Sequence, residues 1–159
     1  MTENKLCNPQ KSSFGMDGNI AVIIFWAVAA VLMISPYTCV LSFICPLIFL
    51  LKEKESSFVR FHAEQCVIYS VIFSIGNLIV GFLADWSQYL KLVIDTSTQT
   101  VETRYAPLIK VAFLPYIFGI IFAALAVLVI IKANTYEAYK LPVAGPIAEK
   151  AQLKDEAAE

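Results

Sequence analysis

Charge is scarce in this chain of 159 residues: 16% of its residues are charged, whereas 58% are hydrophobic. Three stretches carry no formal charge, from Ile20 to Leu51, from Cys66 to Ala84 and from Val111 to Ile131. Each is longer than the roughly 18 apolar residues that mark a membrane-spanning helix. The lack of charge therefore excludes an ordinary soluble domain and predicts an all-α integral membrane protein.

Residues that commonly carry chemistry are also few. The chain has one histidine and four cysteines, without a CxxC pair, and the sequence after His62 lacks the second histidine of HExxH, so no metal site is predicted. No glycine-rich phosphate loop or dinucleotide fingerprint is present, so no cofactor is expected. A thiol facing a packed membrane interior is usually inert, so the pair of His62 and Cys66 is not assigned as catalytic. A pI near 5.8 without a basic patch argues against nucleic acid as a partner.

Proline divides the first apolar stretch. As a single helix it would be about 48 Å long, well beyond a hydrocarbon core of about 30 Å. Ser35-Pro36-Tyr37 lies near its middle, where proline removes a backbone donor and disfavours helix at the preceding residue. We predict a hairpin of two short helices, 19–34 and 37–51, with one kinked and tilted helix as the alternative. Each short helix would be about 23 Å long, which implies local thinning of the bilayer or a shallow turn.

Two longer helices are expected to complete a bundle of four transmembrane helices. Ser57 is the predicted N-cap of the first, and Pro107 is placed to begin the second. The helices are expected over 58–85 and 107–132, with a polar loop over 87–106. The transmembrane domain then covers 19–140, between a polar N-terminal tail at 1–18 and a C-terminal tail at 141–159.

Basic residues set the expected orientation. Nine of the 12 Lys and Arg residues fall in the N-terminal tail, the region 52–60 and the chain from 132 onward. These segments share one side in the four-helix arrangement, and the positive-inside rule places that side in the cytoplasm. We therefore expect a multi-pass protein of the cell membrane, with the His62 region and the C-terminus cytoplasmic. Its expected partners are the lipid bilayer and a second copy or other membrane proteins.

A cluster of polar residues lies at the start of the third predicted helix and is the first candidate interface. Arg60 and Glu64 are four residues apart and can form a helical ion pair. His62 and Gln65 are three apart, so one hydrogen-bonded platform is able to hold all four side chains. Phe58 and Phe61 are expected to anchor this platform among the lipid headgroups.

Two helix faces rich in small or polar residues are candidate contact surfaces. In the third helix the polar face comprises Cys66, Ser70, Ser74, Asn77, Gly81 and Asp85, in line with His62. Small and hydroxylated residues allow close helix contact in a membrane, so this face predicts a packing seam, with the wall of a hydrated path as the alternative. A second seam on the last helix comprises Ala112, Tyr116, Gly119, Ala123 and Ala126, and we expect the two faces to pack together or to form a homodimer.

Two strings resemble a known family. Pro46-Leu47-Ile48 followed by Phe58-Val59-Arg60-Phe61-His62-Ala63-Glu64-Gln65 resembles the "PLI … FVRFHAxQA" signature of the Tic20-like family, which includes the DUF4870 membrane proteins. Lys132-Ala133-Asn134, with the string from Tyr139 to Ala148, is similar to the family ending "KAxxGxxYKLPIIGxIAE". Cys66 stands where the family commonly has alanine. The resemblance implies four helices with both termini on one side of the membrane. The plastid members of that family belong to the protein import machinery of the inner envelope.

Two functional hypotheses follow. The first is a non-enzymatic membrane scaffold or a translocation-associated subunit that assembles through the small-residue seams and the Arg60 to Gln65 region. The second is a small channel or carrier whose path follows Ser70, Ser74, Asn77 and Asp85.

Overall fold

The computed structural model describes residues 5–35, 37–97 and 113–156, and the side chains of 7–35, 37–83 and 113–151. Helices make up most of the described chain. The elements, in order, are β1 (Lys5–Leu6), α1 (Gly18–Ile34), the 3-10 turn η1 (Cys39–Leu41), α2 (Ile44–Lys52), α3 (Ser57–Ser97), α5 (Leu114–Asn134), β2 (Glu137–Ala138) and α6 (Ala144–Glu156).

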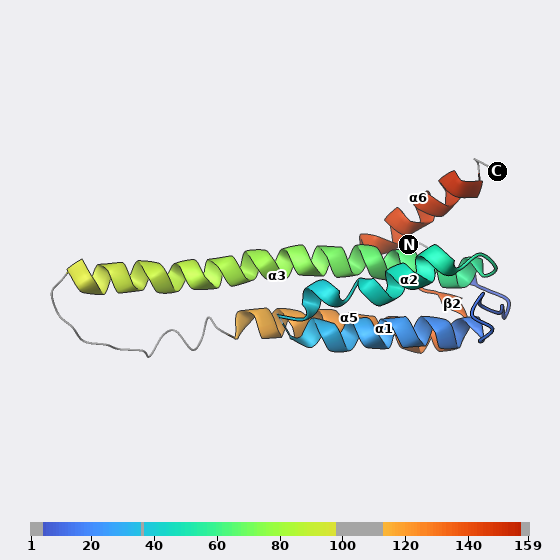
Figure 1. Ribbon diagram of the computed structural model, residues 1–159, viewed down its shortest axis with the longest axis horizontal. Coiled ribbons are helices and arrows are strands. Elements are labelled where there is room, and N and C mark those ends of the chain that lie inside the picture. Colours follow the sequence, from blue (N-terminus) through green and yellow to red (C-terminus); the bar gives the residue numbers. More distant parts are fainter. Residues whose placement is uncertain (1–4, 36, 98–112, 157–159) are drawn as a thin grey trace.

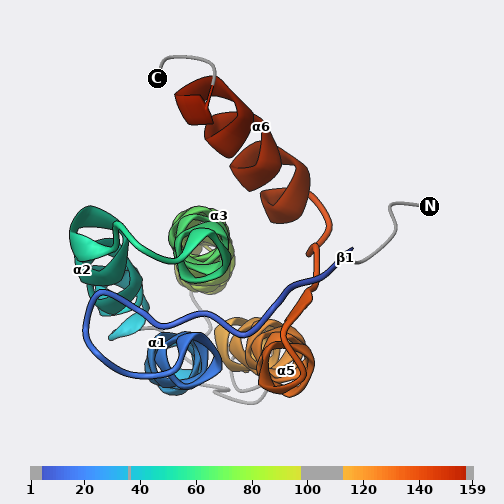
Figure 2. The ribbon, with the colours of Figure 1, turned by 90° about the vertical axis from the view of Figure 1, so that its right-hand side faces the viewer.

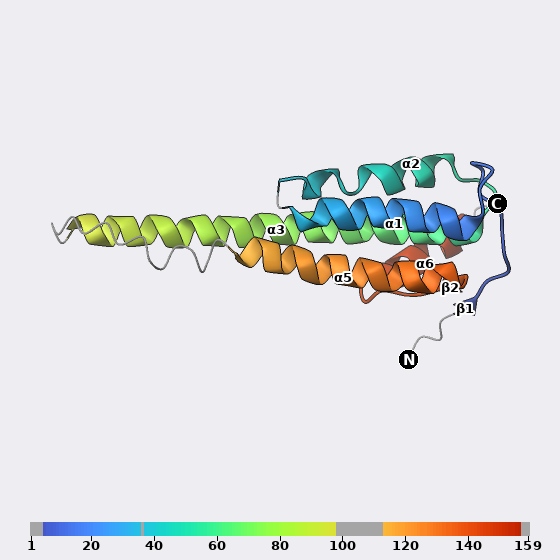
Figure 3. The same cartoon turned by 90° about the horizontal axis from the view of Figure 1, so that it is seen from below.

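Four helices, α1, α2, α3 and α5, run side by side, and α3 extends far beyond the others (Figure 1; Figure 3). Viewed along the bundle, the N-terminal segment crosses the end of the helices and reaches β1, while α6 projects outward beside α3 (Figure 2). The two short strands pair antiparallel, with Lys5 opposite Ala138 and Leu6 opposite Glu137. One end of the bundle is therefore covered by chain, and both described ends of the chain lie near it.

Within the described part of the chain, two helices are long and apolar enough to cross a membrane, over Ser57–Leu83 and Leu114–Asn134. The apolar helices of the hairpin, Gly18–Ile34 and Cys39–Lys52, are shorter than a usual span. The predicted helical membrane bundle is therefore supported at the level of its class. Only two of its four predicted crossings meet the length requirement.

Aromatic rings and small residues fill the interior. Trp26 of α1 and Tyr69 of α3 have ring centroids 5.6 Å apart, and the Tyr69 hydroxyl donates a hydrogen bond of 2.8 Å to the Phe122 carbonyl of α5. Phe73 stacks on Phe118 at 5.4 Å. These contacts join the three helices in one core. Buried alanines on α1 (Ala21, Ala29) and on α5 (Ala126, Ala133) allow these two helices to approach closely.

The helix boundaries differ from the prediction at α2, at α3 and in the C-terminal tail. The second arm of the hairpin, predicted as a helix over 37–51, consists of η1 and then of α2, which begins at Ile44. Helix α3 continues to Ser97 instead of ending near Asp85, so part of the predicted polar loop is helical. The predicted start of the last helix at Pro107 lies outside the described residues, and α5 is described from Leu114. The predicted C-terminal tail contains the helix α6, because Ala144 and Ala148 bury their side chains in the contact with α3.

Candidate functional site

Polar residues gather at the covered end of the bundle, which we call the end layer. It consists of three segments: the N-terminal strap (residues 5–17), the link 53–56 between α2 and α3, and the segment 135–143 between α5 and α6. Hydrogen bonds join all three segments to the helix ends. The end layer is the candidate functional site, because it is where the described polar side chains converge.

Glu53 is the centre of the contact between the strap and the link. Although it lies in the charged run Lys52-Glu53-Lys54-Glu55, its side chain is buried, with only 3% of the residue exposed. The carboxylate accepts hydrogen bonds from the Ser12 hydroxyl, from the Ser13 hydroxyl at 2.8 Å and from the Ser13 amide at 3.0 Å. It also accepts from the amides of Glu55 at 3.1 Å and Ser56 at 3.0 Å. A single carboxylate therefore holds two segments that are about 40 residues apart in sequence.

These hydrogen bonds decide the protonation of Glu53. Burial on its own would raise the pKa of the carboxyl, but hydrogen bonds from Ser12, Ser13 and Ser56 favour the charged form and outweigh burial. The pKa of Glu53 is lowered from the ordinary value of 4.5. The charged carboxylate is therefore the form that closes the strap at neutral pH.

The strap also sets the start of α3. The Ser56 hydroxyl accepts from the Val59 amide at 3.2 Å, so Ser56 is the N-cap, one residue before the predicted Ser57. The same hydroxyl donates to Oε1 of Gln10 at 2.9 Å. The Gln10 carbonyl in turn accepts from the Gly18 amide at 2.8 Å at the start of α1. Gln10 thus joins the first turns of two helices.

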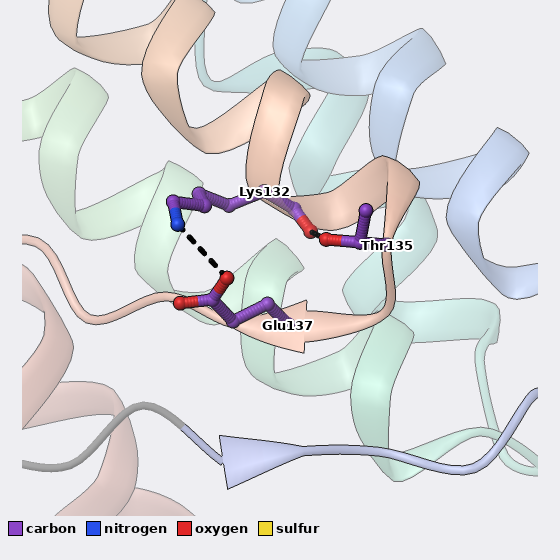
Figure 4. A network of polar contacts seen from close by, with 3 residues as sticks. All are labelled: Lys132, Thr135 and Glu137. Carbon is purple, nitrogen blue, oxygen red and sulfur yellow. Dashed lines mark hydrogen bonds and ion pairs between the residues drawn. The ribbon is translucent and has the colours of Figure 1, made fainter.

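The segment after α5 completes the end layer. Thr135 donates its hydroxyl to the Lys132 carbonyl at 2.8 Å, and Lys132 pairs with Glu137 at 3.0 Å across the turn (Figure 4). Tyr136 has a positive φ of 56°, which ends the helix. Its carbonyl accepts from the Cys7 amide of the strap at 2.9 Å, and its hydroxyl donates to Asn19 at 3.2 Å. The strap is therefore held at both of its ends.

The predicted platform of Arg60, His62, Glu64 and Gln65 is divided between two sides of α3. His62 and Gln65 are fully buried, and the Gln65 amide donates to the Tyr139 carbonyl at 3.2 Å. His62 lies edge-on to the rings of Phe58 and Phe61, at 4.7 Å and 5.3 Å. Both phenylalanines are buried, which corrects the expectation that they anchor in the headgroup region: both pack against His62, and Phe58 also packs against Tyr136.

Arg60 and Glu64 form the i, i+4 ion pair that their spacing predicts, at 3.7 Å. The Arg60 side chain is 42% exposed and that of Glu64 is 10% exposed. This pair is therefore separate from the buried contact of Gln65. The Gln65 bond joins α3 to the segment before α6, and an ion pair of 2.7 Å between Lys140 and Glu149 joins that segment to α6.

The polar face of α3 is buried down to Asn77. Cys66 and Ser70 are fully buried, Ser74 is half-buried, and Asn77 is 6% exposed. The Ser74 hydroxyl donates to the Cys39 carbonyl at 3.3 Å, and the Asn77 amide contacts the Cys39 sulfur at 3.5 Å. This part of the face packs on η1. Gly81 has open space beside it, and the side chain of Asp85 lies outside the described residues.

Gly119 in the α5 seam contacts α1, which differs from the predicted pairing with α3. A Cβ at Gly119 would lie 2.5 Å from the Met33 carbonyl oxygen, so glycine is what permits this approach. Ala126 is buried, Ala123 is half-buried and Tyr116 is 42% exposed. Ala112 lies outside the described residues.

Together, two membrane-length apolar helices, two shorter ones and a polar end layer define a small helical membrane protein. A family model describing the magnetosome magnetite crystal formation protein family matches residues 17–148. A UPF0132 membrane protein of Archaeoglobus fulgidus is 35% identical over 104 residues, which cover 65% of this chain and 78% of that protein. No solved structure matches the chain.

The chain therefore belongs to the magnetosome magnetite crystal formation protein family. This finding corrects the Tic20-like and DUF4870 assignment, which was wrong: the comparisons support the magnetosome family and a UPF0132 relative instead. The resemblance rested on two short strings at helix ends, whereas the family model extends from α1 to α6. The matched region begins at Asp17, so most of the N-terminal strap lies before it.

Sequence reasoning missed the residues that hold the end layer together, namely Gln10, Ser12, Ser13 and Glu53. Alternating charges in the 52–55 run are typical of a solvated link, and nothing near Glu53 in sequence marks it as buried. The available signal was the pair of adjacent serines in an otherwise unassigned N-terminal tail. Serines commonly satisfy backbone or carboxylate groups at helix ends.

Proposed function

We propose that this protein is a non-enzymatic structural component of a cell membrane, which holds a second copy or another membrane protein at its end layer. The supporting observation is that several polar side chains are buried or hydrogen-bonded within the chain itself. Three of them are fully buried within the bundle, namely His62, Gln65 and Cys66. The carboxylate of Glu53 accepts hydrogen bonds from Ser13 of the strap. A general base or nucleophile needs to reach a substrate, and these groups face other parts of the chain.

The composition of the described residues supports the same proposal. Within the described ranges, no three His, Cys, Asp or Glu residues are grouped so as to hold a metal ion. The family name concerns the formation of magnetite crystals in magnetosomes, and the archaeal relative is named only as a membrane protein. A structural role in a membrane is compatible with both names.

The proposal includes an orientation. Lys11, Lys52, Lys54 and Lys132 are exposed at or next to the end layer. The positive-inside rule places this end, with the His62 region and the C-terminus, in the cytoplasm. Partners are then cytoplasmic faces of membrane proteins or the end layer of a second copy.

Photo-crosslinking in native membranes tests this function. A photoreactive residue is placed at Glu55 or Lys54, which are exposed in the link, and at Ile120, which is exposed on the apolar surface of α5, as the control. We expect a discrete protein adduct from both end-layer positions, lipid adducts alone from Ile120, and loss of the protein adduct in a Glu53→Gln background. Monomer alone at both end-layer positions, or an equal protein adduct at Ile120, contradicts the proposal.

The channel hypothesis requires the polar face of α3 to be accessible to water. Ser74 and Asn77 contact η1, which favours packing over a hydrated path. Cysteines placed at Ser70, Ser74 and Asn77 are therefore expected to resist water-soluble thiol reagents in intact membranes. Labelling at all three positions would instead favour a path along this face.

A further inference from the structure

The α1–α2 hairpin ends at a defined level along the bundle. Its turn contacts α3 through Ser74 and Asn77, which bond to Cys39. On the other side, α5 meets the end of α1 at Gly119, next to the carbonyls of Met33 and Ile34. These two contacts fix the depth of the hairpin tip relative to both membrane-length helices.

Charged residues mark where the hydrocarbon begins on the same helices. On α3, Arg60 is 42% exposed at its side chain and Glu64 is the last charged residue before Asp85. On α5, Lys132 is 45% exposed at its side chain and precedes the end layer. The exposed guanidinium of Arg60 lies beside the Glu64 carboxylate, and exposed charges are costly within lipid, so the hydrocarbon boundary lies near Glu64 and Lys132.

Two independent distances follow from that boundary. Glu64 and Asn77 are 13 residues apart on α3, and Lys132 and Gly119 are 13 apart on α5. At about 1.5 Å per residue, both separations correspond to roughly 20 Å. The hydrocarbon core is about 30 Å thick, so the hairpin tip lies about 10 Å short of the far boundary.

Beyond the tip, α3 and α5 continue with apolar side chains. On α3, Leu78 is 67% exposed and Phe82 is 70% exposed. On α5, Leu114 and Ile117 are also exposed. Among the described residues, the ribbons of α3 and α5 extend past the hairpin turn (Figure 1), so the exposed side chains of Phe82 and Leu114, five residues beyond Asn77 and Gly119, have the character of a lipid-facing surface.

Side-chain hydroxyls satisfy part of the irregular backbone of the turn. Backbone carbonyls away from water need internal partners. The Thr38 hydroxyl donates to the Leu32 carbonyl at 2.9 Å, and the Ser42 hydroxyl donates to the Cys39 carbonyl at 2.6 Å. Ser74 adds a third bond, to the same Cys39 carbonyl.

We propose that the α1–α2 hairpin is re-entrant: it enters the bilayer from the end-layer side and turns back within the hydrocarbon. The exposed apolar side chains of α3 and α5 beyond the tip then contact acyl chains of the far leaflet. The chain crosses the membrane twice, through α3 and α5. This arrangement in lipid goes beyond the docking function proposed above, and either proposal can fail without the other.

Two-sided thiol labelling in proteoliposomes tests the hairpin. Single cysteines replace Tyr37 at the tip, Lys54 in the end layer and Thr100 between α3 and α5, in a chain whose native cysteines are changed to alanine. Tyr37 is 86% exposed from protein, so only lipid protects it. We expect Lys54→Cys and Thr100→Cys to be labelled from opposite sides, and Tyr37→Cys to be labelled only after solubilisation. Labelling of Tyr37→Cys in intact vesicles, or of both controls from one side, overturns the proposal.

A second measurement keeps the native cysteines, in case their removal prevents folding. Trp26 and Trp86 are changed to phenylalanine, and Tyr37→Trp is quenched by lipids brominated at different acyl-chain depths. We expect the strongest quenching from bromines near the chain ends, because a tip about 20 Å deep lies just beyond the middle of a hydrocarbon core of about 30 Å. Strongest quenching from bromines next to the headgroups overturns the proposal.

Discussion

Gly119→Ala tests whether α1 and α5 approach as closely in the membrane as they do in the structure. The added methyl carbon would lie 2.5 Å from the Met33 carbonyl oxygen and 3.3 Å from that of Ile34. Both are backbone atoms of α1, so a side-chain rotation cannot relieve the contact. One helix end has to move, and overpacking of this kind typically costs about 1–3 kcal/mol. We expect a loss of stability in that range, which is about a 5- to 150-fold rise in the unfolded fraction at about 1.4 kcal/mol per factor of ten.

Gly81→Ala is the matched control, because nothing lies within 4 Å of a Cβ at that position. Alanine favours helix over glycine by up to about 1 kcal/mol, so the control is expected to be neutral or slightly stabilised. Thermal unfolding in detergent can be followed with a thiol-reactive fluorophore, since the side chains of Cys39 and Cys66 are buried in the folded protein. If Gly119→Ala unfolds at the same temperature as the control or above it, the close α1–α5 contact is refuted.

Four further outcomes are expected. Glu53→Gln should destabilise the closed strap by roughly 1.5–3 kcal/mol, which is the scale of hydrogen bonds to a charged group, and the strap should be cleaved faster by a protease. Glu55→Gln, at an exposed neighbouring position, should leave the rate of cleavage unchanged. Because the folded-state pKa of Glu53 is lowered, strap closure in the parent protein should be complete above the ordinary glutamate pKa of 4.5 and be lost as pH falls through the lower folded value; opening that begins near neutral pH would contradict this. Gln65→Leu removes the bond to the Tyr139 carbonyl and should cost about 1–3 kcal/mol, with faster amide exchange in α6 than in α1 as the readout and equal exchange in both as the contrary result. Lys132→Gln breaks an exposed ion pair and should change stability by less than about 1 kcal/mol; a larger loss in the same unfolding assay would show that the turn after α5 depends on it.

The sequence predicted the membrane class and much of the helix order for physical reasons. Long uncharged runs leave few alternatives to helices in lipid, and the proline at 36 is a strong local signal for the break between α1 and η1. The ion pair of Arg60 and Glu64 follows from helical spacing alone. These features depend on residues that are close to one another in the sequence.

Other features depend on parts of the chain that are distant in sequence. The burial of Glu53 requires serines about 40 residues earlier, and the burial of Phe58 and His62 requires the segment after α5. Gly119 and Ala126 marked a face for close contact, but small residues do not specify which helix approaches. The partner was therefore predicted as α3, whereas the structure places α1 there.

The pairing of β1 with β2 has a consequence for the order of assembly. Lys5 pairs with Ala138, which follows α5 in the sequence. The first described strand therefore has no pairing strand until α5 and β2 have been synthesised. During synthesis the hairpin, α3 and α5 must be in place before the strap is fixed at both ends. The strap therefore closes late, after long-range loop closure that slows folding. Its resistance to proteolysis reports that the whole bundle has been assembled.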